Sequence, residues 1–321
     1  MSRPPSPPAR PRIGGSASSP SRPGRADGTA GTPMLSSRPA CPGGPSEMST
    51  PFKAACVQNR ALRDMSASIA ECDALARRAH AAGADLVALP EFLSCLDKRG
   101  AALEVGILPE SEHPALAHFT ALASELDVWI LLGSLAIDAG GGKANNRSYL
   151  IDATGSVVAR YNKIHMFDVD LADGQSFRES EVFDIGTEAV VAPTPWGRLG
   201  MTVCYDLRFA YLYRTLAQAG ASFLTVPAAF TKTTGEAHWH VLLRARAIET
   251  GSYVIAPCQY GSHGQATTYG HSLIIDPWGE VLAEGSGDEA DAIVAEIDPE
   301  KVAEARRMIP ALTHDRPVQE P

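Results

Sequence analysis

Short apolar runs alternate with segments of helical period along the chain from residue 53 onward. In 66–82 the apolar side chains recur at helical spacing from Ile69 to Ala79, and Gly83 then favours a helix end. The run that follows, 85–90, is almost entirely apolar, which is typical of a strand buried on both faces. The same pattern predicts strands at 53–58, 85–90, 128–137, 147–152, 157–162, 189–194, 199–204, 222–227, 253–258, 271–276, 281–284 and 293–297, and helices at 66–82, 114–126, 208–219, 236–250 and 299–308.

The connections between these elements indicate the architecture. Alternating strands and helices call for sheets covered by helices, and the glycines at 140–142 and the PWG turn at 277–279 mark hairpins. About a dozen strands in roughly 270 residues fit a single α/β domain in which two sheets lie between helix layers. The stretch 168–183 is polar and has no clear period, so no element is predicted there.

The first 50 residues differ in composition from the rest of the chain. They hold 11 of the 24 prolines and 7 of the 28 glycines, and six arginines against two acids give them a net charge of +4. Because the whole chain carries -9, the remainder carries -13. Such a segment cannot bury enough apolar surface to order itself. We predict a disordered extension at 1–48, or an over-long start ahead of Met48, followed by one folded domain at 49–321.

Charge and cysteine usage exclude several classes of protein. An acidic body argues against a nucleic-acid-binding domain, and no apolar run approaches the roughly 18–20 residues of a membrane span. No secretory h-region follows the N-terminus, and the proline density of the head disfavours an organelle-targeting helix. The six cysteines form no CxxC pair and are too sparse for a disulfide scaffold. We expect a cytoplasmic protein with reduced thiols, no nucleic-acid partner and no membrane contact.

Cys204 is the first candidate for chemistry. It ends an apolar run ahead of the predicted helix at 208–219, and Asp206 is suited to be the N-cap of that helix. A thiol at a strand end and helix start experiences the positive field of the helix N-terminus, which favours the nucleophilic thiolate. The backbone N–H groups just after it are free to bind an oxyanion. The alternative is a buried structural cysteine, which taken alone is the more common case.

Charged residues follow two other predicted strands. Glu91 comes directly after a buried strand, where ligand sites form in open α/β sheets, and is suited to be a general base. Lys163 closes a later strand and is suited to donate to an oxyanion. Glu179, with Glu181 as its rival, is placed to pair with Lys163 or to assist proton transfer. The alternatives are solvated loop acids and a surface lysine.

The histidines give no pattern typical of a metal site. His238 and His240 stand two positions apart on the predicted helix 236–250, and such positions do not share a helix face. HxxxH and HExxH spacings are absent. His165 and His271 stand beside strand ends, where they either line a pocket or, more commonly, fill core and loop positions. We predict no metal and no cofactor.

Three short motifs stand in one order along the chain. They are PEF at 90–92, NKIHMFDVD at 162–170 and GMTVCYDLRF at 200–209. Together they resemble the nitrilase (carbon–nitrogen hydrolase) superfamily, and the resemblance covers essentially the whole chain beyond the head. Two longer segments, 226–250 and 269–284, look like the Nit-type amidases, and among these like the deaminated glutathione amidases more than the ω-amidases.

The resemblance implies a fold and a set of catalytic residues. The family fold is a four-layer αββα sandwich. Glu91 matches the general base of the family, Lys163 its oxyanion-stabilising lysine and Cys204 its nucleophile. Glu179, in the RES segment, matches the second glutamate. The 49–321 domain is thereby identified as a carbon–nitrogen hydrolase domain.

The resemblance also implies a reaction. The chain is expected to be a cysteine-dependent amidase that hydrolyses the C–N bond of a small carboxylate-bearing amide through a thioester, without a cofactor. Deaminated glutathione and the ω-amide of a 2-oxo dicarboxylic acid are the substrates it implies. The Tyr205 N–H and Phe230 are expected to hold the oxyanion and the substrate. Nitrile or N-carbamoyl hydrolysis on the same fold, and a non-enzymatic partner-binding scaffold, are the alternatives.

Two further expectations come from the same resemblance. Family members pair through the helix after the nucleophile and through the helix at 236–250, so a homodimer or a larger homo-oligomer is expected. His240 stands where many Nit-type sequences have Glu, which bears on substrate detail and not on the reaction class.

Overall fold

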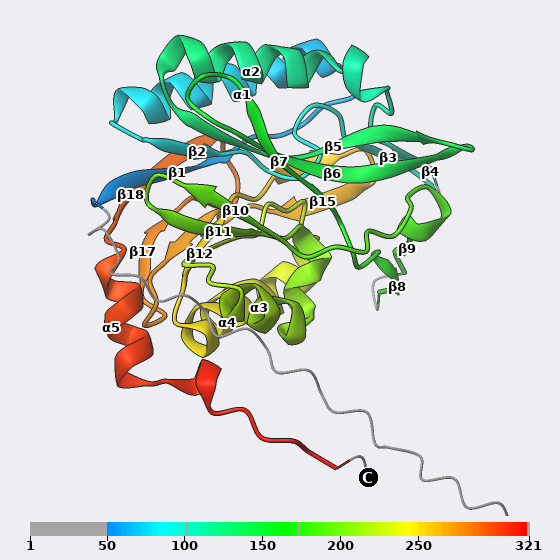
Figure 1. Cartoon of the computed structure of the whole chain (residues 1–321). Coiled ribbons are helices and arrows are strands. Elements are labelled where there is room, and N and C mark those ends of the chain that lie inside the picture. Colours follow the sequence, from blue (N-terminus) through cyan, green and yellow to red (C-terminus); the bar gives the residue numbers. More distant parts are fainter. Residues whose placement is uncertain (1–49, 101, 172–173, 320–321) are drawn as a thin grey trace, which may run out of the picture. The chain divides into compact units, whose positions relative to one another are not determined.

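The computed structural model describes residues 50–100, 102–171 and 174–319. The predicted disordered extension at 1–48 lies outside these residues. The described chain forms two six-stranded sheets that face each other, with helices on their outer faces (Figure 1). The predicted αββα sandwich is confirmed.

The first sheet runs in the order β18–β1–β2–β5–β6–β7. β1 pairs parallel with β2 and β2 with β5, whereas the remaining pairs are antiparallel. The parallel strands correspond to the continuous apolar runs of the sequence, because both of their faces are buried. The strands are β1 (Phe52–Gln58), β2 (Leu86–Ala88), β5 (Trp129–Gly140), β6 (Lys143–Ile151), β7 (Val157–Asn162) and β18 (Asp291–Ile297).

The second sheet repeats the plan of the first. Its order is β10–β11–β12–β13–β16–β17, with β11, β12 and β13 parallel and antiparallel strands outside them. β16 and β17 form the hairpin that the PWG turn predicts. The strands are β10 (Val190–Thr194), β11 (Gly197–Met201), β12 (Phe223–Thr225), β13 (Tyr253–Ala256), β16 (Leu273–Ile275) and β17 (Val281–Glu284).

Two helices cover each sheet. α1 (Met65–Ala81) and α2 (Pro114–Leu126) lie on the first sheet, and α3 (Ala210–Gln218) and α4 (Lys232–Thr250) lie on the second (Figure 1). α5 (Glu300–Met308) follows β18. Within the described residues, no helix has the length and apolar character needed to cross a membrane.

Alternate residues of β1 enter two different cores. Ala54 and Cys56 pack between the two sheets, whereas Ala55 and Val57 pack under α1 and α2. Successive side chains of a strand point to opposite faces, so a strand with a core on each side must be apolar at every position. This is why the pattern of the sequence predicts the central strands well.

The sequence pattern does not predict three two-stranded hairpins. Their strands are short and polar, and one hairpin lies in the stretch 168–183, for which no element is predicted. β3, β4, β8 and β9 lie toward the same end of the sandwich (Figure 1). The hairpins are β3 (Asp97–Arg99) with β4 (Ala102–Glu104), β8 (Asp168–Asp170) with β9 (Ser176–Arg178), and β14 (Tyr260–His263) with β15 (Ala266–Tyr269).

Candidate active site

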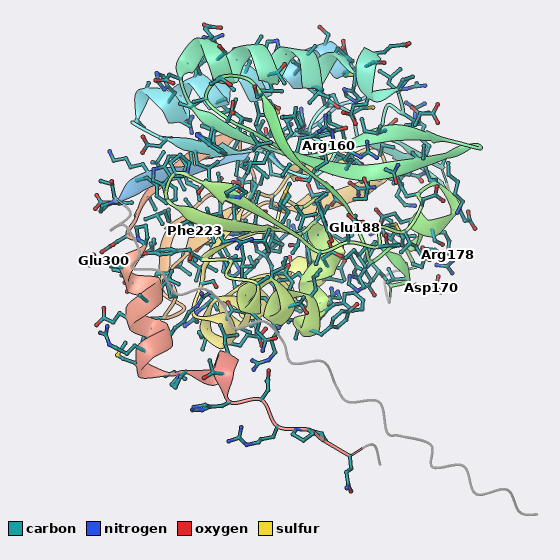
Figure 2. The ribbon with its side chains drawn as sticks, viewed as in Figure 1. Arg160, Asp170, Arg178, Glu188, Phe223 and Glu300 are labelled. Carbon is teal, nitrogen blue, oxygen red and sulfur yellow. The ribbon has the colours of Figure 1, made fainter. Side chains whose placement is uncertain are left out.

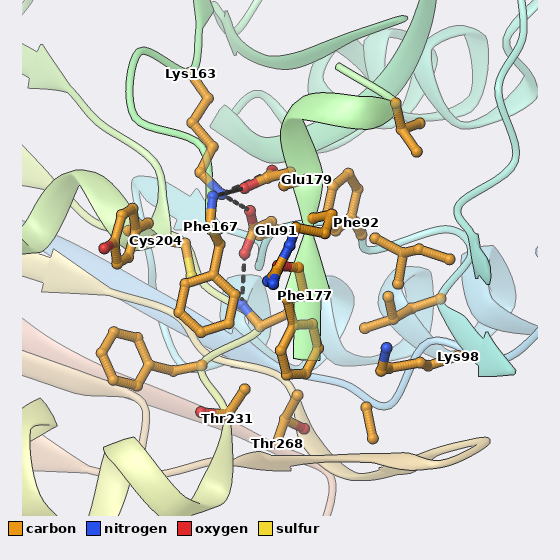
Figure 3. Close-up of a pocket in the computed structure, with 18 of the residues that line it drawn as sticks. Glu91, Phe92, Lys98, Lys163, Phe167, Phe177, Glu179, Cys204, Thr231 and Thr268 are labelled. Carbon is orange, nitrogen blue, oxygen red and sulfur yellow. Dashed lines mark hydrogen bonds and ion pairs between the residues drawn. The ribbon is translucent and has the colours of Figure 1, made fainter. Parts of the chain in front are cut away.

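Four residues singled out from the sequence meet at one cavity between the sheets. Glu91 follows β2 and Lys163 follows β7, both of the first sheet, while Cys204 follows β11 of the second sheet. Glu179 opens the 3-10 helix η2 (Glu179–Glu181) behind the β8–β9 hairpin. All four side chains are buried, and they line a cavity of about 100 Å³ (Figure 3).

The ammonium group of Lys163 lies at the centre of this set. It donates to Glu91 Oε1 at 2.9 Å and to both oxygens of Glu179 at 2.9 and 2.8 Å. Asn146 Nδ2 donates to the same Oε1 atoms of Glu91 and Glu179, at 2.9 and 3.0 Å. Because a buried charge is tolerated only when it is paired, these contacts hold the two carboxylates and the lysine in one arrangement.

Glu91 is also held from the second sheet. Its Oε2 accepts a hydrogen bond from the backbone N–H of Ala229 at 2.9 Å, and Gln259 Nε2 donates to its backbone carbonyl at 2.7 Å. The thiol of Cys204 lies beside its carboxylate, whose negative charge contributes to raising the pKa of the thiol. One carboxylate therefore lies between the charged lysine and the thiol, a position that suits a proton-transfer group.

The backbone of Cys204 is in the left-handed region, with φ of 49°, which is uncommon for a residue other than glycine. Its N–H donates to the carbonyl of Pro227 at 2.9 Å. Cys204 opens the 3-10 helix η3 (Cys204–Arg208). The Asp206 N–H donates to the Val203 carbonyl at 3.1 Å, which leaves the Tyr205 N–H as the group of the first turn with no backbone acceptor among the described residues. Strained backbone of this kind concentrates at functional sites.

The predicted N-cap role of Asp206 is wrong. α3 begins at Ala210, and Phe209 precedes it as N-cap. The buried Asp206 carboxylate instead accepts from the N–H of Val203 at 2.9 Å and from the Tyr161 hydroxyl at 2.7 Å. Asp206 therefore fixes the turn that carries Cys204, and η3 separates the thiol from the N-terminus of α3.

The expected stabilisation of a resting thiolate is also wrong. Burial and the charge of Glu91 raise the pKa of the Cys204 thiol well above its ordinary value, and Lys163 only partly opposes this. Burial lowers the pKa of Lys163, but the carboxylates of Glu179 and Glu91 outweigh burial and raise it well above its ordinary value. Burial raises the pKa of Glu179 despite the nearby Lys163. The resting site thus holds a neutral thiol and a charged lysine.

The remaining predicted residues lie on the wall of the same cavity. Tyr205 and Phe230 both line it, and so does Glu181, the rival of Glu179. Phe230 is buried against Trp239, with ring centroids 4.9 Å apart. Lys163 donates its hydrogen bonds to Glu179 and not to Glu181, so the geometry favours Glu179.

Lys98, which the sequence analysis missed, lines the end of the cavity away from Cys204 (Figure 3). Its Nζ donates to the carbonyls of Gly100 and Ser176, at 2.9 and 3.0 Å, and lies 4.5 Å from the ring centroid of Phe177. Among the residues that the structure describes, no carboxylate lies within ion-pair distance of it. Burial lowers the pKa of Lys98.

The neighbouring cation of the cavity, Arg178, is already paired. Its guanidinium donates to both oxygens of Asp170 at 2.8 and 3.0 Å, across the β8–β9 hairpin (Figure 2). Lys98 therefore differs from Arg178 in having no anionic partner in the described chain.

Two histidines have partners other than the cavity. His165 Nδ1 lies 2.7 Å from Asp206 Oδ1 and its ring stacks on Phe209, so it has a packing role. His240 does not line the cavity and is not paired with His238. It lies beside His271 and Glu284, which are far from it in sequence.

Comparison with known proteins gives a consistent result. Residues 53–307 match the carbon–nitrogen hydrolase family. The chain is similar to the deaminated glutathione amidase of Synechocystis sp., with 39% identity over 274 residues that cover 82% of this chain and 98% of the relative. It is 38% identical to the deaminated glutathione amidase of Homo sapiens over 277 residues, 83% of either chain.

Solved structures share the fold. The NitFhit protein of C. elegans has a TM-score of 0.76 and 33% identity, and the match covers 84% of this chain and 66% of that one. Nit3 of Saccharomyces cerevisiae, a member of branch 10 of the nitrilase superfamily, has a TM-score of 0.72 and 26% identity, with 84% and 98% of the two chains covered.

Proposed function

Because the chain belongs to the carbon–nitrogen hydrolase family, an amidase family, we propose that its substrate is a small carboxylate-bearing amide and that Cys204 is the nucleophile. Deaminated glutathione, for which its relatives are named, and the ω-amides of 2-oxo dicarboxylic acids are the candidate substrates. The observation that carries the proposal is the buried set of Glu91, Lys163 and Glu179 beside the Cys204 thiol. We also propose that 49–321 is the hydrolase domain, with 1–48 outside it.

The reaction begins with a neutral thiol. As Cys204 Sγ attacks the amide carbon, Glu91 takes its proton, which avoids a free thiolate in a buried site. A protonated Glu91 is a weaker acceptor, so Lys163 has an N–H available for the oxygen that becomes negative. The Tyr205 N–H donates to the same oxygen, and Glu179 keeps Lys163 charged.

The second half of the reaction uses the same groups. Glu91 gives its proton to the departing nitrogen, and the C–N bond breaks to leave a thioester on Cys204. A water molecule then loses a proton to Glu91 and attacks the thioester carbon. The C–S bond then breaks and the proton on Glu91 returns to Cys204 Sγ, which restores the neutral thiol. The products are the acid and ammonia, or an amine when the amide nitrogen is substituted.

We propose that Lys98 binds the carboxylate of the substrate. It is a buried cation that lacks an anionic partner in the described chain, and it faces the same cavity as the thiol. A substrate carboxylate would supply the missing negative charge. Its charged hydrogen bond would offset the hydration free energy that the ammonium group loses on burial. The aromatic rings of Phe167 and Phe177 lie between Lys98 and Cys204, so they would enclose the chain that joins carboxylate and amide (Figure 3).

Lys98→Met is expected to raise KM for a carboxylate-bearing amide such as succinamate by about 10–100-fold, since a charged hydrogen bond is worth about 1.5–3 kcal/mol. The kcat should change little, because Lys98 is remote from the thiol. Steady-state kinetics on succinamate and on butyramide, a neutral amide of the same carbon number, measure the difference. Lys53→Met, which removes an exposed lysine, is the matched control. An equal loss on both amides would show that Lys98 shapes the loop and does not bind the carboxylate.

We propose a homodimer formed through α3 and α4. Tyr211 on α3 and Val241 and Ile248 on α4 are large apolar side chains that are 62%, 67% and 53% exposed. Val241 and Ile248 stand seven positions apart and so share one helix face. Large apolar side chains that are exposed on both helices of one layer are typical of a surface that another protein covers.

Val241→Asp is expected to shift the protein from dimer to monomer, because it would place a charge at the centre of an apolar contact. Sedimentation velocity over a range of concentrations measures the change. Ile185→Asp is the control, since Ile185 is equally exposed, at 64%, but lies outside α3 and α4. Loss of the dimer in both variants, or in neither, would contradict the proposed interface.

One panel of substrates tests the reaction class. Ammonia release from ω-amides of 2-oxo acids, a nitrile and an N-carbamoyl amino acid, together with hydrolysis of deaminated glutathione, distinguishes amidase from nitrilase and carbamoylase activity. The proposal requires turnover of at least one carboxylate-bearing amide. Turnover of the nitrile or the N-carbamoyl compound alone would replace it by the corresponding alternative, and turnover of none would favour a non-enzymatic scaffold.

A further inference from the structure

We propose that His240, His271 and Glu284 form a binding site for a divalent transition-metal cation of the zinc class. The three residues come from α4, from the segment just before β16 and from the end of β17. None of them lines the cavity that holds Cys204. The site would therefore be distinct from the amidase site, and it departs from the prediction that the chain binds no metal.

The donor atoms of the three side chains converge. His240 Nε2 is 3.0 Å and His271 Nδ1 is 2.8 Å from the same carboxylate oxygen, Glu284 Oε1. One ligand atom from each residue lies within 4.8 Å of the others. The side chains are 32%, 29% and 40% exposed, so a hydrated cation can reach them and keep water as a further ligand.

The chemistry of this donor set suits zinc. Two imidazole nitrogens and one glutamate oxygen are the protein ligands of open zinc sites, at about 2.0–2.2 Å from the metal. Tetrahedral bonds of that length put neighbouring ligand atoms about 3.3 Å apart. The observed contacts of 3.0 and 2.8 Å are only slightly shorter. A cation could therefore replace the two bridging protons, with shifts of a few tenths of an ångström between each imidazole and the carboxylate, while the two imidazole nitrogens, within 4.8 Å of each other, approach to the same spacing.

The surroundings hold His271 in this position. Its backbone is left-handed, with φ of 52°, and its carbonyl accepts from Trp239 Nε1 at 2.8 Å. The ring packs against Gly287, where a Cβ atom would lie 2.6 Å from His271 Nε2. The Tyr269 ring also packs against the cluster, with its centroid 4.3 Å from that of His271 and 6.0 Å from that of His240. A preorganised ligand loses little freedom when the metal binds.

Zinc titration of the full chain tests the site. Isothermal calorimetry with ZnCl2 is performed in a Cys204→Ala background, so that the cavity thiol adds no second site. We expect saturation at one Zn²⁺ per chain. His240→Ala and Glu284→Gln should each weaken binding by more than about tenfold, since even the loss of an outer-shell partner costs 10–100-fold. His238→Ala removes a neighbouring histidine of α4 that lies outside the cluster, and it should bind zinc as the parent does.

Two outcomes would overturn the proposal. One is the absence of saturable zinc binding by the parent chain, which would leave the three residues as a hydrogen-bonded cluster. The other is binding that His240→Ala and Glu284→Gln leave unchanged. Thermal melting without metal verifies that both variants are folded, and Co²⁺ absorption in the visible range reports directly on whether nitrogen ligands are bound.

Discussion

Cys204→Ala is expected to abolish amide hydrolysis, with a fall in kcat on the order of 10⁶-fold, as for the loss of a nucleophile in other acyl-transfer enzymes. The remaining groups can still bind an oxyanion, but no atom is left to form the thioester. Ammonia release or product chromatography under substrate saturation measures the loss. The fold should persist, because the substitution removes one sulfur atom beside an existing cavity.

A second buried cysteine provides the control. Cys72→Ala removes the thiol of a residue of α1 that packs between the helices and the first sheet, remote from the cavity. Its activity should stay within a few-fold of the parent. Bound substrate should also slow the alkylation of Cys204 and leave the alkylation rates of the other cysteines unchanged. Full activity in Cys204→Ala would remove the nucleophile from the proposal.

Glu91→Gln is expected to lower kcat by about 10²–10⁴-fold, the usual contribution of a general acid–base group. The amide matches the carboxylate in shape but cannot take the thiol proton. Burial raises the pKa of the Cys204 thiol. In this variant, which lacks the base, the thiol must therefore lose its proton to hydroxide from the solvent. Because the pKa of the buried thiol lies above that of a model thiol, the thiolate fraction and with it the residual activity should rise with pH throughout the range from 7 to 9 without reaching a plateau.

Glu181→Gln is the matched control for this charge. Glu181 also lines the cavity, but the contacts of Lys163 are with Glu91 and Glu179. Its activity should remain within about threefold of the parent, since it removes no group of the proposed mechanism. If Glu181→Gln were as damaging as Glu91→Gln, the loss would reflect the net charge of the cavity and not the proton transfer.

The sequence predicts best those features whose signal lies within one short stretch of the chain. The central strands are predictable because a core lies on each of their faces, as for β1, whose residues are apolar almost without interruption. Glu91 and Cys204 could be singled out because each follows a buried apolar run, whereas Lys163 follows β7, an edge strand that is partly exposed, and is recognisable through its motif. The order of their motifs makes the family recognisable before any contact is known.

The residues that the sequence does not predict correctly owe their roles to tertiary contacts. Asn146 is one polar residue among several in β6, and only the fold reveals that it donates to both Glu91 and Glu179. Aspartate is a common N-cap residue, but the Asp206 carboxylate accepts a hydrogen bond from the Val203 N–H in the 3-10 turn that precedes α3. His240 and Glu284 are 44 positions apart, beyond the reach of any helical or strand spacing.

Glu91 and Lys163 follow strands of the first sheet, whereas Cys204 follows a strand of the second. This division has a consequence for the thiol during synthesis of the chain. Glu91, Lys163 and Glu179 all precede Cys204, and Ala229, which anchors Glu91, follows it. A nascent chain that has reached only Cys204 still lacks β12, β13, β16 and β17 of the second sheet. The thiol thus meets the carboxylate of Glu91, its proposed base, in the proper geometry only when both sheets have formed. Separating the sheets would return it to the state of an ordinary cysteine without a partner.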